Sequence, residues 1–468
     1  MRSRSRLAWA LALAAAGIAS AAEAAPPRRP HIVLILADDV GWNDVGYHGS
    51  DIHTPNLDRL AAEGVELDQF YTLPGCTPTR ASLMTGRYPI RYGMQEGVLW
   101  PWTDGGLPLE ERTLPEALRE AGYRTVMIGK WHLGMSSPEY LPLARGFDYH
   151  YGLYSGLIEY YRHVYYGALD WHRNGRPAVE PGYATHLLAK EAVQIVDSHD
   201  PKQPLFLYVP FNAPHAPLQV PPEYLERYAR IQNPNRRAFC GMVTALDEAI
   251  GQIVQAVRAR GLAEDTLILF ASDNGGTISA GGSNAPLRGS KGTLYEGGLR
   301  VPALAVWPGT LTPGARVEGM IHVVDWYTTL LALAGASAEQ TLPVDGLDVW
   351  PAIAGEAPSP RTQVLLNVNR KHGAVRIGTW KLIRFYGSPP RTELYDLATD
   401  PGERRDLARV NREKVEQLEA RLDVYRVNAA EPRLFPTQYK PIGFQIPRVW
   451  GDPVEEPSPR RRFRVNAP

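Results

Sequence analysis

Cysteine is scarce in this sequence, because Cys76 and Cys240 are the only two among 468 residues. Such a count excludes a small scaffold held together by several disulfides. One disulfide between the two residues stays open as an alternative, since disulfides form in oxidising compartments. Apolar residues at helical spacing surround Cys240, however, and this favours a buried thiol on a long helix. We therefore expect two free cysteines in different settings.

An excess of charge of either sign is also missing. The 50 lysines and arginines balance 50 aspartates and glutamates, so the formal net charge at pH 7 is zero. This balance gives no electrostatic reason to expect nucleic acid or an anionic membrane as a general partner. A locally basic pocket is still compatible with it.

Long apolar runs are missing after the first two dozen residues. Three arginines within the first six residues precede an apolar run over residues 7–18, and small residues follow as far as Ala24. This pattern predicts a secretory signal peptide over residues 1–24. A membrane anchor is the alternative, but the run is too short to cross a bilayer comfortably. We expect an exported protein, periplasmic or secreted, without stable membrane insertion.

Short apolar runs and amphipathic helices alternate over residues 28–360, which we interpret as the main domain. Buried strands are expected within 31–39, 125–129, 204–211 and 266–276. Alternation of this kind predicts an α/β sandwich around a mostly parallel sheet. Residues 361–428 show consecutive strands and then a helix, which predicts a small α+β domain with an antiparallel sheet. The Pro- and Arg-rich tail, 429–468, is expected to wrap the surface or stay mobile.

Three helix starts carry local signals. Thr54 precedes Pro55 and an apolar stripe, so it is expected to cap a helix that ends before Gly64. Thr113 and Glu116 have the spacing of a capping box. Asp325 is expected to cap the helix within 325–335.

Polar residues with oxygen ligands follow the first and the last of the expected buried strands. Asp38 and Asp39 end one strand, and Asp273 and Asn274 end the other. The carboxyl ends of parallel strands meet at one edge of a sheet, where ligands gather. Carboxylate and amide oxygens suit a hard cation, Ca²⁺ or Mg²⁺, rather than a soft metal. The alternative is a polar cluster of caps and turns without a metal.

Basic residues reach the same edge from other segments. Lys130 and His132 follow the strand at 125–129, and His215 follows the strand at 204–211. Lys291 lies in a Gly-rich loop. Each residue alone is unremarkable as a signal, since a loop lysine is usually only solvated. Their expected convergence beside a cation predicts a pocket for a small anion.

Cys76 lies at the expected start of a helix in "GCTPTRASLMTGRYPIR". Pro78 suits the first turn of a helix, and Arg80 lies four residues after Cys76, on the same face. A helix N-terminus and a guanidinium both favour a tetrahedral oxyanion. A thiol nevertheless suits an oxygen-preferring cation poorly.

The segment "CTPTRASLMTGR" resembles the signature of the type I sulfatase family, C-x-P-x-R-x4-T-G. The segments "GKWHLG", "SDNGG" and "PLRGSKGTLYEGG" extend the resemblance, which runs from about residue 30 to about residue 425 and is strongest to the arylsulfatase B branch, the N-acetylgalactosamine-4-sulfatases. It implies an alkaline-phosphatase-like sandwich and an enzyme that cleaves sulfate esters, for example 4-O-sulfated N-acetylgalactosamine. It also implies that a formylglycine-generating enzyme oxidises Cys76 to formylglycine (3-oxoalanine), whose hydrate is an oxygen nucleophile.

The resemblance implies a role for each candidate residue. The implied ligands of one calcium ion, with magnesium as the alternative, are Asp38, Asp39, Cys76, Asp273 and Asn274. The implied catalytic residues are Cys76 as nucleophile, Arg80 beside it, Lys130 and Lys291 on the sulfate oxygens, His132 near the second hydroxyl and His215 near the leaving oxygen. Thr79 stands where many members have serine, and the C-terminal region is shorter than in the lysosomal enzyme.

Two other functions stay open at the level of sequence. One is a phosphatase or phosphonate monoester hydrolase of the same superfamily. The other is a non-catalytic protein that binds sulfated glycans and leaves Cys76 unmodified. Trp100, Trp102 and Tyr154 are candidates for stacking on a sugar, although aromatic side chains are more often packing elements.

Overall fold

The computed structural model describes residues 29–434 and 439–451. The expected signal peptide and part of the expected tail lie outside this range. Among the described residues, no helix is both long and apolar enough to cross a membrane. Cys76 and Cys240 are both free and buried, so the expectation of two unpaired cysteines is confirmed.

A single ten-stranded sheet forms the centre of the main domain, in the spatial order β12-β2-β11-β10-β1-β9-β3-β4-β7-β8. Its strands are β1 (His31–Ala37), β2 (Val65–Tyr71), β3 (Arg124–Lys130), β4 (Tyr149–Leu153), β7 (His172–Arg173), β8 (Arg176–Pro177), β9 (Leu205–Pro210), β10 (Thr266–Ser272), β11 (Ala303–Val306) and β12 (Ala315–His322). The five strands from β10 to β4 are mutually parallel. The antiparallel strands lie toward the two sides. The predicted fold class is confirmed.

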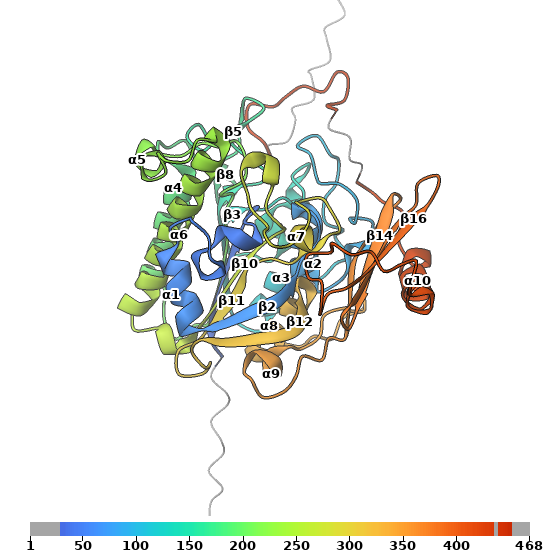
Figure 1. Ribbon diagram of the computed structural model, residues 1–468. Coiled ribbons are helices and arrows are strands. Elements are labelled where there is room, and N and C mark those ends of the chain that lie inside the picture. Colours follow the sequence, from blue (N-terminus) through green and yellow to red (C-terminus); the bar gives the residue numbers. More distant parts are fainter. Residues whose placement is uncertain (1–28, 435–438, 452–468) are drawn as a thin grey trace, which may run out of the picture.

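Helices cover both faces of this sheet (Figure 1). One face carries α2 (Cys76–Thr85), α3 (Leu114–Glu120) and α8 (Val323–Ala334). The other carries α1 (Pro55–Glu63), α4 (Ala184–Ser198) and α6 (Pro234–Ala259). Shorter helices are α5 (Pro222–Arg227), α7 (Glu296–Leu299) and α9 (Trp350–Ile353).

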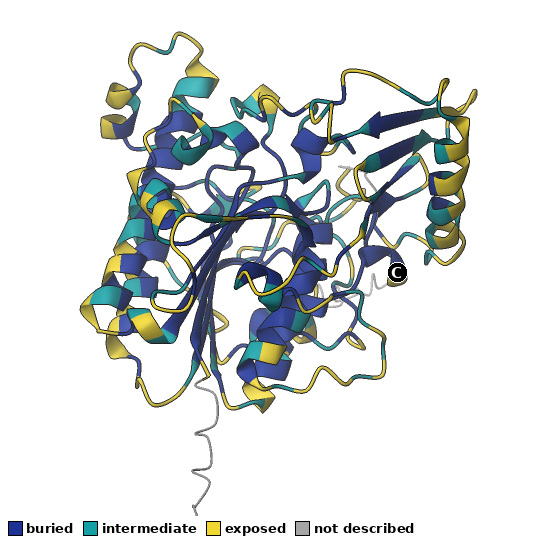
Figure 2. Cartoon of the chain, turned by 60° about the horizontal axis from the view of Figure 1, so that its bottom comes forward, coloured by how far each residue is buried: buried dark blue, intermediate teal, exposed yellow. Residues whose placement is uncertain are grey.

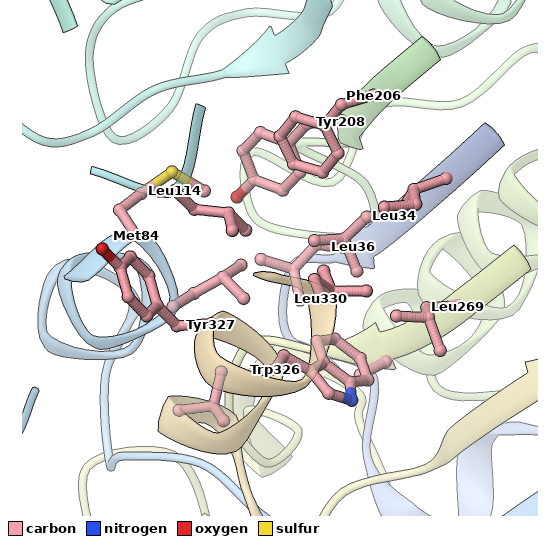
Figure 3. Packing of buried hydrophobic residues seen from close by; sticks show 14 of the residues in the cluster. Leu34, Leu36, Met84, Leu114, Phe206, Tyr208, Leu269, Trp326, Tyr327 and Leu330 are labelled. Carbon is pink, nitrogen blue, oxygen red and sulfur yellow. The ribbon is translucent and has the colours of Figure 1, made fainter. Parts of the chain in front are cut away.

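Strand β1 shows why its sequence must lie between two helical layers. Successive side chains of a strand point to opposite faces, so Leu34 and Leu36 pack on one side while Val33 and Ile35 pack on the other. Figure 3 shows the first side, where Leu34 and Leu36 lie near helix residues such as Trp326. A strand that is apolar at every position is typical of a parallel sheet covered on both faces.

A second, four-stranded antiparallel sheet lies beside the main domain and is coloured orange in Figure 1. It contains β13 (Gln363–Val368), β14 (His372–Ile377), β15 (Trp380–Phe385) and β16 (Arg391–Asp396), and is covered by α10 (Arg412–Val427). Leu418 and Leu422 of α10 pack on one face of this sheet. The other face packs against the main domain through residues such as Tyr71 and Leu299. Figure 2 shows that the outer side of α10 is exposed.

Part of the C-terminal tail lies along the main domain. Val449 pairs with Leu169 next to the small hairpin of β5 (Val164–Tyr165) and β6 (Ala168–Leu169). The indole nitrogen of Trp450 donates a hydrogen bond to the carbonyl of Tyr165 at 2.8 Å. This segment therefore lies against the surface of the main domain, which is one of the two alternatives expected for the tail.

The helix starts only partly follow their local signals. The capping box of Thr113 and Glu116 is present at α3, as predicted. At α8 the N-cap is His322, and Asp325 lies three residues inside the helix, so that prediction was wrong.

Thr54 occupies the N-cap position of α1, as predicted, but its side chain makes no capping hydrogen bond. Its hydroxyl instead accepts a hydrogen bond from the amide of Gly46 and donates one to Asp58. The carboxylate of Asp247, on α6, accepts from the amides of Asn56 and Leu57 at 3.1 and 2.8 Å. A tertiary contact thus replaced the local cap.

The two domains are tied together by a buried ion cluster. The ammonium of Lys381, in β15, lies 2.9 Å from Glu296 and 2.8 Å from Glu403, and its side chain is fully buried. Glu296 also accepts a hydrogen bond from the hydroxyl of Tyr71 at 2.7 Å. Because α7 begins at Glu296, five residues after Lys291, this cluster fixes the loop that carries Lys291.

Replacing Lys381 with methionine should strongly destabilise the protein. The change leaves two buried carboxylates without their shared cation, and breaking a buried ion pair in this way costs about 3–5 kcal/mol. Urea-induced unfolding would measure the loss. The matched control is Lys190→Met on the exposed side of α4, which should change stability by less than about 0.5 kcal/mol. Equal effects of the two substitutions would contradict the structural role of the cluster.

Candidate active site

The candidate residues gather at the carboxyl ends of four neighbouring strands, β10, β1, β9 and β3. Asp273 directly follows β10, Asp38 directly follows β1, and Lys130 is the last residue of β3. His215 comes five residues after β9. Since these strands run in parallel, their ends meet at one edge of the sheet, and segments far apart in sequence deliver polar groups to one place.

Asp39 lies at the centre of the hydrogen-bond network. Its backbone has a φ of 76°, a left-handed conformation that non-glycine residues seldom adopt. Its carboxylate accepts from the side-chain nitrogen of Asn274 at 2.7 Å, from the hydroxyl of Thr277 at 2.9 Å and from the ammonium of Lys291 at 2.6 Å. Strain at a buried carboxylate with several partners is typical of a functional site.

The other two aspartates are held by basic side chains. Lys130 donates to Asp38 Oδ2 at 2.6 Å, and both groups are fully buried. Arg80 donates through Nε and Nη2 to Asp273 Oδ2 at 3.1 and 2.8 Å, and through Nη1 to the carbonyl of Lys130 at 3.0 Å. Together with Lys291 and Asp39, three carboxylates face three basic groups, so their formal charges cancel.

Cys76 is the first residue of α2 and lies against this cluster. Ligand atoms of Asp38, Asp39, Cys76 and His215 all lie within 4.8 Å of one another. Burial raises the pKa of the Cys76 thiol. An unmodified Cys76 is therefore a poor thiolate nucleophile, because the thiolate is the reactive form.

The oxygen-rich side of the cluster fits a hard cation. Asp38 Oδ1 and Asn274 Oδ1 are buried and have no hydrogen-bond partner among the described residues. Burial, and then the neighbouring Asp38, raise the pKa of Asp273. A divalent cation would bind these two unpaired oxygens and reduce the repulsion between the neighbouring carboxylates. Asp38, Asp39, Asp273 and Asn274 are thus the residues that would hold it, with residue 76 adjacent.

The two histidines each have one ring nitrogen engaged by a backbone carbonyl. His132 Nε2 lies 2.9 Å from the carbonyl of Leu99, and His215 Nδ1 lies 2.7 Å from the carbonyl of Ala216. A carbonyl only accepts, so each engaged nitrogen carries the proton and the other nitrogen presents a lone pair. His132 Nδ1 is buried and has no partner within the described part of the chain, and His215 Nε2 lies 3.9 Å from Asp39 Oδ2.

The three aromatic candidates differ in exposure. Trp100 and Trp102 are half-buried and stacked, with ring centroids 5.7 Å apart. Trp100 also borders a small cavity together with His132. Tyr154 is buried between the rings of His150 and His172, so it is a packing element, the commoner of the two alternatives, and does not offer a face to a sugar.

Two contributions to the site were missed by sequence reasoning. Thr277 binds Asp39, and its position three residues after Asn274, in a polar segment after a strand, was a signal that could have identified it. The carbonyl of Leu99 orients His132. A backbone group of an irregular loop leaves no pattern in the sequence, so only the tertiary structure reveals it.

Comparisons of sequence agree with this arrangement. A family model described as Sulfatase matches residues 30–336, and one described as N-sulphoglucosamine sulphohydrolase, C-terminal, matches residues 290–428. Arylsulfatase J of Mus musculus is 42% identical over 360 residues, which are 75% of this chain and 60% of that relative. N-acetylgalactosamine-6-sulfatase of Canis lupus familiaris is 37% identical over 380 residues, or 74% of this chain and 69% of the relative.

Comparison of structures gives the same result. The crystal structure of Ps i-CgsB in complex with k-i-k-neocarrahexaose is 34% identical in sequence, with a TM-score of 0.82. The match covers 88% of this chain and 95% of that chain. The likeness therefore includes both the main domain and the small antiparallel sheet.

Calcium should raise the thermal stability of the chelator-treated protein. A ligand at a hundredfold excess over its Kd stabilises the folded state by about 2.7 kcal/mol, which is roughly 3 °C in Tm for a chain of this length. In Asp38→Asn the shift should be largely lost, while the exposed control Asp104→Asn should keep it. Differential scanning calorimetry with and without calcium makes the comparison. An equal calcium shift in both variants would show that the cation binds elsewhere.

Proposed function

The chain belongs to the sulfatase family, a family of sulfuric ester hydrolases, and from this premise we propose that it hydrolyses sulfate monoesters of sugars with an oxidised residue 76 as nucleophile. The expected family is confirmed. The observation that carries the proposal is the position of Cys76, at a helix N-terminus and within 4.8 Å of the ligand atoms of Asp38, Asp39 and His215. A buried thiol has no evident use beside oxygen ligands for a hard cation, whereas an oxygen nucleophile has one.

Two groups complete the proposed site. Formylglycine at position 76 supplies, as its hydrate, an oxygen nucleophile, and a calcium ion, with magnesium as the alternative, supplies a Lewis acid beside it. Asp38, Asp39, Asp273 and Asn274 would hold the cation, because Asp38 Oδ1 and Asn274 Oδ1 are buried without a hydrogen-bond partner among the described residues. A formylglycine-generating enzyme is the partner that this maturation requires.

Two basic residues of the chain would bind the sulfate group, and a third would hold residue 76. Lys130 and Lys291 each neutralise an aspartate here, and both lie at the same edge as Cys76. Once a cation neutralises the aspartates, these ammonium groups can contact sulfate oxygens and stabilise charge that develops during the reaction. Arg80, held by Asp273, keeps a fixed guanidinium beside residue 76.

Proton transfers are assigned to residues with an available site. His132 Nδ1 presents a lone pair in the buried site and would take the proton of the second hydroxyl at residue 76. Lys291 would protonate the departing alcohol oxygen, since its ammonium carries protons and lies beside Asp39 on the open side. His215 lies on the same side and would do so only after its Nε2 takes up a proton. Asp273 would accept the first proton from the nucleophile. Each step moves a proton between positioned groups, without free water attacking a crowded anion.

The substrate class follows from the relatives. One is an N-acetylgalactosamine-6-sulfatase, and one solved structure holds k-i-k-neocarrahexaose. We therefore propose a sulfated glycan or a small sulfate ester as substrate, with 4-O-sulfated N-acetylgalactosamine as one example. Export to the periplasm or medium belongs to the same proposal, because the segment at residues 1–24 has the pattern of a signal peptide.

The peptide that contains Cys76 should carry an aldehyde in place of the thiol in active protein. Mass spectrometry of the digested protein measures this directly. Cys76→Ala should lower kcat by more than about 10³-fold, since removing a nucleophile abolishes the covalent route. Cys240→Ala, the matched control in the core of α6, should retain activity. An unmodified thiol in an active preparation would refute the mechanism, and an unmodified thiol in an inactive one would favour a glycan-binding protein.

The kcat/KM for 4-nitrophenyl sulfate should exceed that for 4-nitrophenyl phosphate. A two-metal phosphatase needs more histidine and aspartate ligands than the described site provides, together with a serine or threonine nucleophile. Steady-state rates on the two esters under one set of conditions make the test. The reverse preference would assign the protein to the phosphatase or phosphonate monoester hydrolase alternative.

A further inference from the structure

A pocket beside the candidate active site is lined by residues of both domains. Its volume is about 320 Å³, and Gly75 and Lys291 line it on the catalytic side. The opposite wall is the turn between β13 and β14, with Asn369, Lys371 and His372. We call it the hairpin pocket. Because Gly75 directly precedes residue 76, a group bound in the hairpin pocket lies next to the reacting sulfate ester.

The hairpin wall is held in place by hydrogen bonds within the turn. The side-chain oxygen of Asn369 accepts from the amides of Lys371 and His372 at 2.8 and 2.9 Å. The carbonyl of Lys371 accepts from the amide of Tyr386 at 2.8 Å. A backbone fixed in this way loses little conformational entropy when a ligand binds, which is a requirement for an effective binding site.

The hairpin also contacts the catalytic domain directly. Asn367 donates to the carbonyl of Gln95 at 3.0 Å, and Arg370 Nε lies 3.3 Å from Glu96 Oε2. These contacts fix the width of the pocket. They also neutralise Glu96, the one acidic residue among those that line the pocket in the described chain.

The groups that stay available have a defined chemistry. Lys371 is exposed and brings a positive charge to a pocket in which the neutralised Glu96 is the one acidic residue among the described lining residues. The Nδ1 of His372 is buried without a hydrogen-bond partner in the described structure. A pocket with an exposed ammonium and a single, already neutralised carboxylate among its described lining residues suits a polar ligand with an anionic group.

We propose that the hairpin pocket binds the sugar next to the one that carries the cleaved sulfate, and that Lys371 recognises an anionic group on this second sugar. The inference rests on the proposed function, which places a sulfated sugar at residue 76. The anion is a carboxylate or a second sulfate ester, since both offer charged oxygens to an ammonium. The substrate class thereby narrows to glycans with anionic groups on adjacent sugars.

Three disaccharides test the proposal. All carry 4-O-sulfated N-acetylgalactosamine, and they differ in the second sugar, which is glucose, glucuronate or glucose 6-sulfate. Calorimetry on the Cys76→Ala background measures Kd without turnover. At least one anionic disaccharide should bind more tightly than the neutral one, and Lys371→Gln should weaken that binding about fivefold and leave the neutral disaccharide unchanged. The anionic disaccharide that loses more affinity in Lys371→Gln shows whether Lys371 binds a carboxylate or a sulfate ester. This loss of affinity should become smaller with added salt.

Two further variants sharpen the result. Lys371→Glu should weaken the anionic disaccharides more than Lys371→Gln, because repulsion replaces attraction, whereas the distant control Lys190→Gln should change none of them. Equal affinities for all three disaccharides, or an equal loss for all three in Lys371→Gln, would overturn the proposal. Failure of the proposed function is seen separately, as an unconverted Cys76 or as no hydrolysis of 4-nitrophenyl sulfate.

Discussion

Electrostatic balance at the carboxyl edge of the sheet is the constraint on which the rest of the site depends. Three buried carboxylates lie beside the buried Arg80 and Lys130 and the partly exposed Lys291, and each basic group already holds one carboxylate. An isolated charge in this volume would be very costly, so the pairs must form for the chain to fold. A divalent cation added to this neutral group leaves two positive charges, which an anion can neutralise. In our proposal, the cation and the sulfate ester therefore favour each other's binding.

The parallel sheet allows these charged groups to gather in one place without disturbing the apolar core. Four neighbouring strands deliver their polar ends to one edge, while their apolar stems are covered by helices on both faces. Helix α2 contributes its N-terminus to the same edge, with Cys76 as its first residue. Partial positive charge there favours an anion in the place where the basic side chains also favour one.

The small antiparallel sheet supports the candidate active site although it carries none of the proposed cation ligands. Its ion cluster at Lys381 fixes the segment that leads back to Lys291. Its β13–β14 turn forms the far wall of the hairpin pocket. Chemistry at the sulfate therefore depends on the main domain, while the choice among glycans depends, in our proposal, on contacts across the domain boundary.

Much of the fold and of the candidate site could be predicted from the sequence, because the patterns that indicate them involve neighbouring residues. The apolar strand runs, the polar residues that end them and the capping box at Thr113 are patterns of neighbours, and they were enough to predict the α/β fold and to place the candidate residues at strand ends. The motif around Cys76 added the family. Such patterns depend on the dihedral angles and spacing of a few adjacent residues, which the sequence specifies directly.

Only the tertiary structure decided the pairings. It showed that Lys291 holds Asp39, and that the carboxylate of Asp247 rather than the hydroxyl of Thr54 binds the first amides of α1. It also showed that the carbonyl of Leu99 orients the ring of His132. These partners are separated by tens to hundreds of residues. Their contacts depend on how layers pack and on where irregular loops close, and no local spacing encodes those distances.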